Sequence, residues 1–220
     1  MIRKIFTSKL TRFALFSYGS YQIFLKPAFN AGGGVYNHFF RQRVNFKERY
    51  GENSYALVTG ATNGIGEEFA EQLAKEGLNL VLVGRSEEKL KKKQEELENK
   101  YPNHRIETRR LDLSSQDLED YRNLAKSVET LDIGMVINNA GVITMNPLSE
   151  ENPVTLHNLV NTNIGPYVYL THELLPRLKK REKKSAILFT SSNASSNVRP
   201  YMAAYSASKT FNDIFAQRLN

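Results

Sequence analysis

Short apolar runs alternate with stretches of helical periodicity from residue 55 almost to the last residue. Runs of this length without regular polar positions are typical of strands buried on both faces, although the run at 104–111 is the weakest. Strands are expected at 55–59, 78–83, 104–111, 133–138 and 185–190, and helices at 87–100, 115–129, 153–180 and 202–219. The alternation predicts an α/β fold with a parallel sheet covered by helices on both faces.

The first apolar run leads into a glycine-rich turn, Thr59-Gly60-Ala61-Thr62-Asn63-Gly64-Ile65-Gly66. Glycine accepts positive φ and has no Cβ, so a phosphate can approach the backbone of such a turn closely. A helix is expected next, because Ile65, Phe69 and Leu73 recur at helical spacing. Its free N–H groups would attract a pyrophosphate, so the turn predicts a dinucleotide site. The alternative is an ordinary strand-to-helix turn.

The tip of the second strand reads Val83-Gly84-Arg85-Ser86 and lies about 20 residues beyond the glycines. An acidic residue at this place would bind the ribose 2′-hydroxyl of NAD, but none is present. A guanidinium can pair instead with a 2′-phosphate, and a serine hydroxyl can add a hydrogen bond. Arg85 and Ser86 therefore predict NADP(H) as the cofactor, unless Arg85 is a solvent-facing loop arginine.

The excess positive charge lies in residues 1–47, which contain eight basic residues and no acidic one. Residues 48–220 carry 22 basic and 23 acidic residues, so the main domain does not resemble a nucleic-acid-binding protein. The thirteen uncharged residues 13–25 are fewer than the about 20 that span a membrane. They favour an interfacial membrane anchor or an organelle targeting segment, with a poorly ordered extension as the alternative.

Two residue types further restrict the chemistry. Cysteine is absent, which excludes a disulfide framework and a cysteine nucleophile. The four histidines are scattered along the chain, so no metal site is expected.

Four motifs together resemble the short-chain dehydrogenase/reductase family. They are TGATNGIG at 59–66, Asp112 after the third strand, NNAG at 138–141 and YSASK at 205–209. Segments 48–90 and 131–142 more narrowly resemble the branch with 17β-hydroxysteroid dehydrogenases and very-long-chain 3-oxoacyl-CoA reductases. The resemblance implies a Rossmann-type, doubly wound domain over 48–220. It also implies hydride transfer between NADP(H) and a lipid or steroid ketone.

Tyr205 and Lys209 match the Tyr-x-x-x-Lys motif of that family, although this spacing also occurs by chance. Tyr205 would donate the proton that the carbonyl oxygen needs during reduction. Lys209 lies one helical turn later, and its charge would favour the phenolate form of Tyr205. The resemblance also assigns the lysine to the hydroxyls of the nicotinamide ribose.

Two further catalytic residues are implied by the resemblance. Ser192 lies thirteen residues before Tyr205 and would hydrogen-bond the substrate carbonyl. Its nearest rival is Ser191, and Ser195 and Ser196 are more remote rivals. Asn163 would help to hold a proton-relaying water, with Asn161 as its rival. The residues expected to bind the cofactor are Thr59, Gly60, Thr62, Asn63, Gly64, Ile65, Gly66, Arg85, Ser86, Asp112, Asn139, Ala140, Gly141, Tyr205 and Lys209.

The resemblance also implies features outside the motifs. The family continues beyond the last helix with further strands and a substrate lid, so this chain is expected to lack the last strands of the sheet. It would then be either an active reductase or a chain that binds cofactor or a partner with little activity. The branch implies the endoplasmic reticulum membrane, and a soluble or mitochondrial reductase of another carbonyl is the alternative. A homodimer is expected through 153–180 and 202–219.

Overall fold

The computed structural model describes residues 44–197 and 199–219, which form a parallel five-stranded sheet flanked by helices. The strand order is β3-β2-β1-β4-β5. The strands are β1 Tyr55–Thr59, β2 Asn79–Gly84, β3 Ile106–Arg110, β4 Ile133–Asn138 and β5 Ala186–Phe189. The sheet grows outward from β1 in both directions, so the predicted doubly wound parallel sheet is confirmed.

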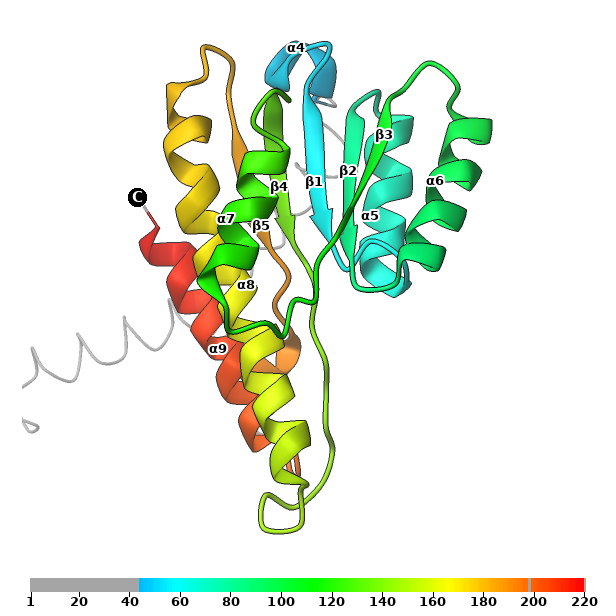
Figure 1. Cartoon of the computed structure of the whole chain (residues 1–220). Coiled ribbons are helices and arrows are strands. Elements are labelled where there is room, and N and C mark those ends of the chain that lie inside the picture. Colours follow the sequence, from blue (N-terminus) through cyan, green and yellow to red (C-terminus); the bar gives the residue numbers. More distant parts are fainter. Residues whose placement is uncertain (1–43, 198, 220) are drawn as a thin grey trace, which may run out of the picture. The chain divides into compact units, whose positions relative to one another are not determined.

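Helices cover both faces of this sheet (Figure 1). They are α4 Phe46–Tyr50, α5 Gly64–Lys75, α6 Glu87–Lys100, α7 Leu118–Ser127, α8 Pro153–Lys180 and α9 Ala203–Arg218, with the short turn η2 Asn193–Ser195 before α9. The core of one face contains α5 and α6, and the core of the other contains α7 and α8. The helices expected at 87–100 and 153–180 agree with α6 and α8 residue by residue, whereas α4 was not predicted.

Successive side chains of the central strands enter different cores. In β1, Leu57 packs in the core with α7 and α8, whereas Val58 packs in the core with α5 and α6. Every residue of β1 is buried, as is every residue of β2 and β4. Burying one such side chain contributes about 1.5–3 kcal/mol, so two-sided burial explains why these strands are uninterrupted apolar runs.

The strand order also fixes where a ligand can bind. The chain builds β1, β2 and β3 in one direction and then crosses over to β4 on the other side of β1. The connection that follows β1 therefore leads toward β2, and the connection that follows β4 leads in the opposite direction, toward β5. Sheets of this kind bind their ligands in the crevice that this divergence creates at the carboxyl ends of the strands.

The chain divides into two units, Met1–Val44 and Asn45–Asn220. Helix α4 belongs to the second unit, and the Asn45 side chain caps it by accepting a hydrogen bond from the N–H of Glu48. Residues 1–43 lie outside the described residues, so the anchor or targeting role of 1–47 stays a prediction. Within the described ranges, no helix combines the length and the hydropathy that crossing a bilayer requires.

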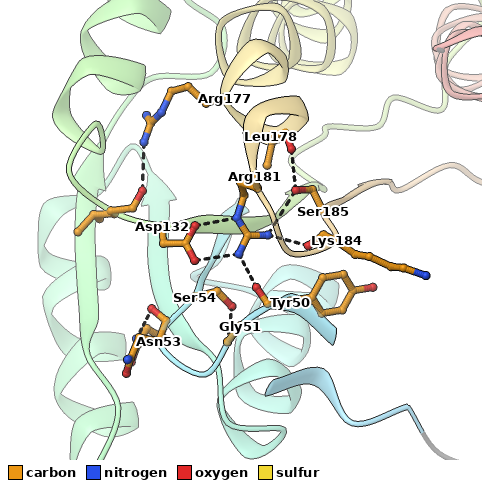
Figure 2. A network of polar contacts seen from close by, with 12 residues as sticks. Tyr50, Gly51, Asn53, Ser54, Asp132, Arg177, Leu178, Arg181, Lys184 and Ser185 are labelled. Carbon is orange, nitrogen blue, oxygen red and sulfur yellow. Dashed lines mark hydrogen bonds and ion pairs between the residues drawn. The ribbon is translucent and has the colours of Figure 1, made fainter. Parts of the chain in front are cut away.

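Two arginines at the C-terminal end of α8 form hydrogen bonds to segments that precede the strands. Arg181 forms a two-pronged ion pair with Asp132, at 2.7 and 2.8 Å, just before β4 (Figure 2). Arg181 also donates to the carbonyls of Tyr50 and Lys184, which joins α4 to the approach to β5. Arg177 donates to four carbonyl groups at and beyond the C-terminal end of α7. Arg177 and Arg181 thus connect the C-terminal end of α8 to two segments that are distant in sequence, α4 and the stretch between α7 and β4.

Replacing Arg181 with methionine should lower the free energy of unfolding by about 2 kcal/mol, because the hydrogen bonds of a nearly buried cation are lost. The side chain of Asp132 is 54% exposed, so water can solvate it in the variant. Urea unfolding of the wild type and Arg181→Met measures the loss. The matched control is Lys180→Met, which removes the same charge from the exposed preceding residue and should change stability by less than about 0.5 kcal/mol. Equal losses in the two variants would contradict the role given to Arg181.

Candidate active site

A cleft of about 470 Å³ opens at the carboxyl ends of the strands. Its walls come from the segments that follow β1, β2, β3, β4 and β5 and from α8 and α9. The lining residues that the sequence predicted are Gly60, Thr62, Asn63, Gly64, Ile65, Arg85, Asp112, Asn139, Ala140, Gly141, Tyr205 and Lys209. The fold therefore brings all four motifs and the Arg85 loop together around one cleft of a size that suits a small ligand.

The glycine turn has the shape that a phosphate needs. A Cβ on Gly66 would lie 2.2 Å from the carbonyl oxygen of Gly60, so only glycine fits there. Gly64 has a φ of +57°, and a Cβ on it would meet nothing within 4 Å. Asn63 makes no side-chain hydrogen bond to the first turn of α5, so the backbone N–H groups of that turn can serve a ligand. These residues fit a dinucleotide pyrophosphate.

Thr59 lies beneath the cleft rather than in its wall, and its side chain is fully buried. Its hydroxyl donates to the carbonyl of Ile137 at 3.2 Å and accepts from the N–H groups of Asn139 and Ala140 at 2.9 and 3.1 Å. The Asn139 amide donates in return to the carbonyl of Thr59 at 3.1 Å. Thr59 and Asn139 thus join the carboxyl ends of β1 and β4.

Arg85 and Asp112 line the same part of the cleft, after β2 and β3. The backbone N–H and the hydroxyl of Ser114 donate to Asp112 at 3.0 and 2.8 Å. These bonds, with a smaller contribution from the charge of Arg85, lower the pKa of Asp112. Ser86 lies outside the lining, because its hydroxyl accepts from the N–H of Lys89 and caps α6. Arg85 is thus the cationic side chain that this part of the cleft presents to a ligand.

Tyr205 and Lys209 lie one turn apart on α9, and the Lys209 Nζ is 5.9 Å from the centroid of the Tyr205 ring. Lys209 is only 3% exposed. Its Nζ donates to the carbonyl of Thr190 at 2.9 Å and to the hydroxyl of Tyr167 at 3.3 Å. Burial lowers the pKa of Lys209 to about 8, and Asp213 acts in the opposite direction. A buried lysine with a lowered pKa in a cleft is typical of a functional site.

The two candidate serines differ in position and in hydrogen bonding. Ser191 lines the cleft, whereas Ser192 does not. The hydroxyl of Ser191 donates to the carbonyl of Lys209 at 3.4 Å. The Ser192 oxygen instead accepts from the N–H of Ala194 at 3.2 Å, which leaves its own proton available to a ligand. Position therefore favours Ser191, and hydrogen-bonding capacity favours Ser192.

Asn163 is fully buried in α8 and does not line the cleft. Its amide oxygen accepts from the N–H of Val142 at 2.8 Å, and its amide nitrogen donates to the carbonyl of Val142 at 2.9 Å. The same nitrogen donates to the hydroxyl of Ser208 at 3.0 Å. Asn163 therefore fixes the loop after β4 against α9. Its rival Asn161 accepts instead from Gln116 and borders a separate hollow.

Two buried polar residues of α8 were not predicted. Tyr167 contacts Lys209, and Thr171 accepts from the amide of Asn138 at 3.0 Å. They follow Asn163 at intervals of four, and this polar spacing on a buried helix face was the available signal. Neither residue lines the cleft. The lining residues that were not predicted are Gly84, Leu111, Leu113, Ser114, Val142, Ile143, Thr162 and Thr190, and Ser191 was named only as the rival of Ser192.

Sequence comparisons agree with this geometry. A family model described as short chain dehydrogenase matches residues 54–220. The very-long-chain 3-oxoacyl-CoA reductase of Neurospora crassa is 37% identical over 177 residues, which are 80% of this chain and 53% of that protein. The inactive hydroxysteroid dehydrogenase-like protein 1 of Homo sapiens is 36% identical, over 80% of this chain and 53% of that protein. The chain thus spans about half the length of these curated relatives.

Solved structures show the same similarity. A short chain dehydrogenase from Salmonella enterica serovar Typhi has a TM-score of 0.72 and 29% identity, over 82% of this chain and 73% of that chain. A short chain dehydrogenase from Shigella flexneri, complexed with NADP, has a TM-score of 0.67 and 31% identity, over 77% of this chain and 75% of that chain. Both likenesses extend over most of the described residues.

The buried Lys209 should make stability depend on pH between about 8 and 10.5. Below pH 8 the amine is charged in both the folded and the unfolded state, and the folded state bears the full cost of its burial. Between the two pKa values only the unfolded state keeps the proton, so the free energy of unfolding rises, by roughly 3 kcal/mol in total. Urea unfolding at a series of pH values measures this rise, which Lys209→Met should lack. Parallel profiles for the two proteins would contradict the burial of a cation here.

Proposed function

The chain belongs to the short-chain dehydrogenase family of oxidoreductases, and on that premise we propose that it is an NADPH-dependent reductase of a lipid ketone. The observation that carries the proposal is the single cleft that Tyr205 and Lys209 line together with the glycine turn. In this proposal Tyr205 is the proton donor, Lys209 is the cation that stabilises its phenolate, and the glycine turn binds the phosphates. All three lie at the carboxyl ends of the strands, where a sheet of this kind binds its ligand.

The residues around the cleft suit an NADP(H) molecule. The glycine turn and the N-terminus of α5 would hold the pyrophosphate, and Arg85 would pair with the 2′-phosphate. Asp112 would contact the adenine, as the family resemblance implies. The similar Shigella flexneri structure is complexed with NADP, which supports this choice of cofactor. When bound, the nicotinamide supplies the hydride that reduces the carbonyl carbon.

Side chains of this protein would supply the proton that the substrate oxygen needs after hydride transfer. Tyr205 donates it to the developing alkoxide, and the nearby ammonium of Lys209 stabilises the phenolate that remains. Ser192 uses its available proton to hydrogen-bond the substrate oxygen. Asn163 holds the loop that carries Gly141, where an added Cβ would lie 3.3 Å from the Lys209 Nζ. The proton-relaying water assigned to Asn163 also belongs to the proposal.

We propose a 3-oxoacyl-CoA or a steroid ketone as the substrate. The name of the Neurospora crassa relative, a very-long-chain 3-oxoacyl-CoA reductase, supports the first of these. Val142 and Ile143 line the cleft with exposed apolar side chains, and exposed Met145 and Leu148 continue the same loop. A hydrocarbon chain could lie against this loop, because apolar contact area stabilises such an arrangement.

A second candidate function is cofactor or partner binding with little turnover. It is favoured by the similarity to a human relative whose name calls it inactive. Under this alternative NADPH would bind in the cleft, but no ketone would be reduced.

Location and assembly are further parts of the proposal. The resemblance to the branch supports the endoplasmic reticulum membrane, with contact through 1–47. A homodimer through α8 and α9 is supported by their exposed apolar side chains. These are Val154, Val160 and Tyr169 on α8, and Phe211 and Ile214 on α9.

Tyr205→Phe should reduce the oxidation of NADPH by a 3-oxoacyl-CoA or a steroid ketone at least about 100-fold, because the proton donor is lost. The absorbance of NADPH measures the rate, and calorimetry should show that the variant still binds NADPH. Tyr201→Phe is the matched control, since Tyr201 is 63% exposed and does not line the cleft. Undiminished turnover in Tyr205→Phe would contradict the role of this tyrosine. Binding without turnover in the wild type would favour the second candidate function.

Ser192→Ala should lower kcat about 100-fold, because the substrate oxygen loses its donor, whereas Ser191→Ala should lower it less than about threefold. The two variants remove the same group from adjacent residues, so each controls for the other. Steady-state kinetics with NADPH and the ketone substrate distinguish them. A larger loss in Ser191→Ala would assign the donor to Ser191 instead.

A further inference from the structure

Tyr167 lies in α8, four residues after Asn163, and is fully buried. Its ring packs beside Phe189 at the end of β5, with 6.0 Å between the ring centroids. Its hydroxyl donates to the carbonyl of Thr190 at 3.3 Å and accepts from the Nζ of Lys209 at 3.3 Å. One buried hydroxyl therefore joins α8, the end of β5 and α9 directly behind the cleft.

The hydrogen bonds of Lys209 can be counted. An ammonium group has three N–H donors. The carbonyl of Thr190 takes one at 2.9 Å, and the hydroxyl of Tyr167 takes a second. The Nζ also lies 5.3 Å from the centroid of the Tyr167 ring. Because the Thr190 carbonyl and the Tyr167 hydroxyl accept two of the N–H groups, the third N–H of Lys209 remains for a ligand in the cleft that Lys209 lines.

We propose that Tyr167 is a positioning residue, whose hydroxyl holds the ammonium of Lys209 so that its remaining proton is directed at the cleft. The inference rests on the proposed function, because it gives Lys209 a task toward Tyr205 and the cofactor. No motif of the sequence assigns Tyr167 to the site. The contacts between side chains brought together by the packing of α8 against α9 carry the assignment.

The hydroxyl holds the lysine rather than passing a proton. Burial, with a smaller contribution from Tyr205, raises the pKa of Tyr167, so it keeps its proton. That proton is directed at the carbonyl of Thr190, which has no proton to pass on. The titratable groups that face Lys209 are Tyr167 on α8 and Tyr205 and Asp213 on α9.

A purely structural role makes a different prediction. The Tyr167 ring alone could fill its place in the core, and phenylalanine would then substitute without affecting Lys209. A positioning role requires the oxygen, because the oxygen accepts from the charged amine and thereby favours the charged form. Tyr167→Phe separates the two roles, since it keeps the ring and the contact with Phe189.

The first measurement follows Lys209 itself. The full chain is labelled with ¹³C at the lysine Cε, and the resonance of Lys209 is identified by its absence in Lys209→Met. In Tyr167→Phe the titration midpoint of this resonance should fall by about one pH unit, because the ammonium loses an acceptor. Tyr169→Phe, which removes a hydroxyl from the same helix two residues later, should leave the midpoint unchanged. This measurement requires neither cofactor nor turnover.

The second measurement uses turnover of NADPH and the ketone substrate. Tyr167→Phe should lower kcat about tenfold with little change in KM, and the alkaline limb of the kcat profile should move to lower pH by the same amount as the midpoint. An unchanged midpoint, or an equal shift in Tyr169→Phe, would overturn the role of Tyr167. If the wild type shows no turnover, the proposed function fails, and the midpoint alone decides whether Tyr167 holds Lys209.

Discussion

The hydroxyl of Thr59 joins the two central strands where their hydrogen-bond ladder ends. It bonds to the carbonyl of Ile137 and to the N–H groups of two residues after β4, so one buried side chain satisfies three backbone groups. Asn139 extends the connection by accepting from the hydroxyl of Thr190 after β5. The cleft therefore has a rigid floor that the chain itself builds.

Buried polar side chains of α8 and α9 form hydrogen bonds to residues around the cleft. Asn163, Tyr167 and Thr171 lie at intervals of four on α8, and each bonds to a residue near the cleft or to an end of a strand. Asn212 on α9 is fully buried and donates to the backbone carbonyl of Asn163 at 3.0 Å, which fixes the two helices to each other. In so dry a region a charged Lys209 is costly, and its partners offset part of that cost.

Much of the fold could be predicted from sequence, because strands buried on both faces consist mostly of apolar residues. The sequence also predicts that the motifs lie close together, because each follows or lies near the end of a parallel strand, and these ends share one edge of the sheet. The details depended on hydrogen-bond directions that no motif encodes. Thr59 faces inward to join two strands, and Ser86 caps a helix, although both were expected at the cofactor. The contact of Tyr167 with Lys209 depends on how α8 packs against α9, which the sequence pattern does not specify.

The central claim is that this cleft binds a nicotinamide dinucleotide that carries a 2′-phosphate. Calorimetric titration of the full chain with NADPH and with NADH tests it most directly. The account predicts that NADPH binds at least about tenfold more tightly, because the guanidinium of Arg85 pairs with the 2′-phosphate, and that Arg85→Ala removes most of this difference. Equal affinities for the two cofactors would contradict the assignment of NADP(H), and no binding of either would contradict the assignment of the cleft.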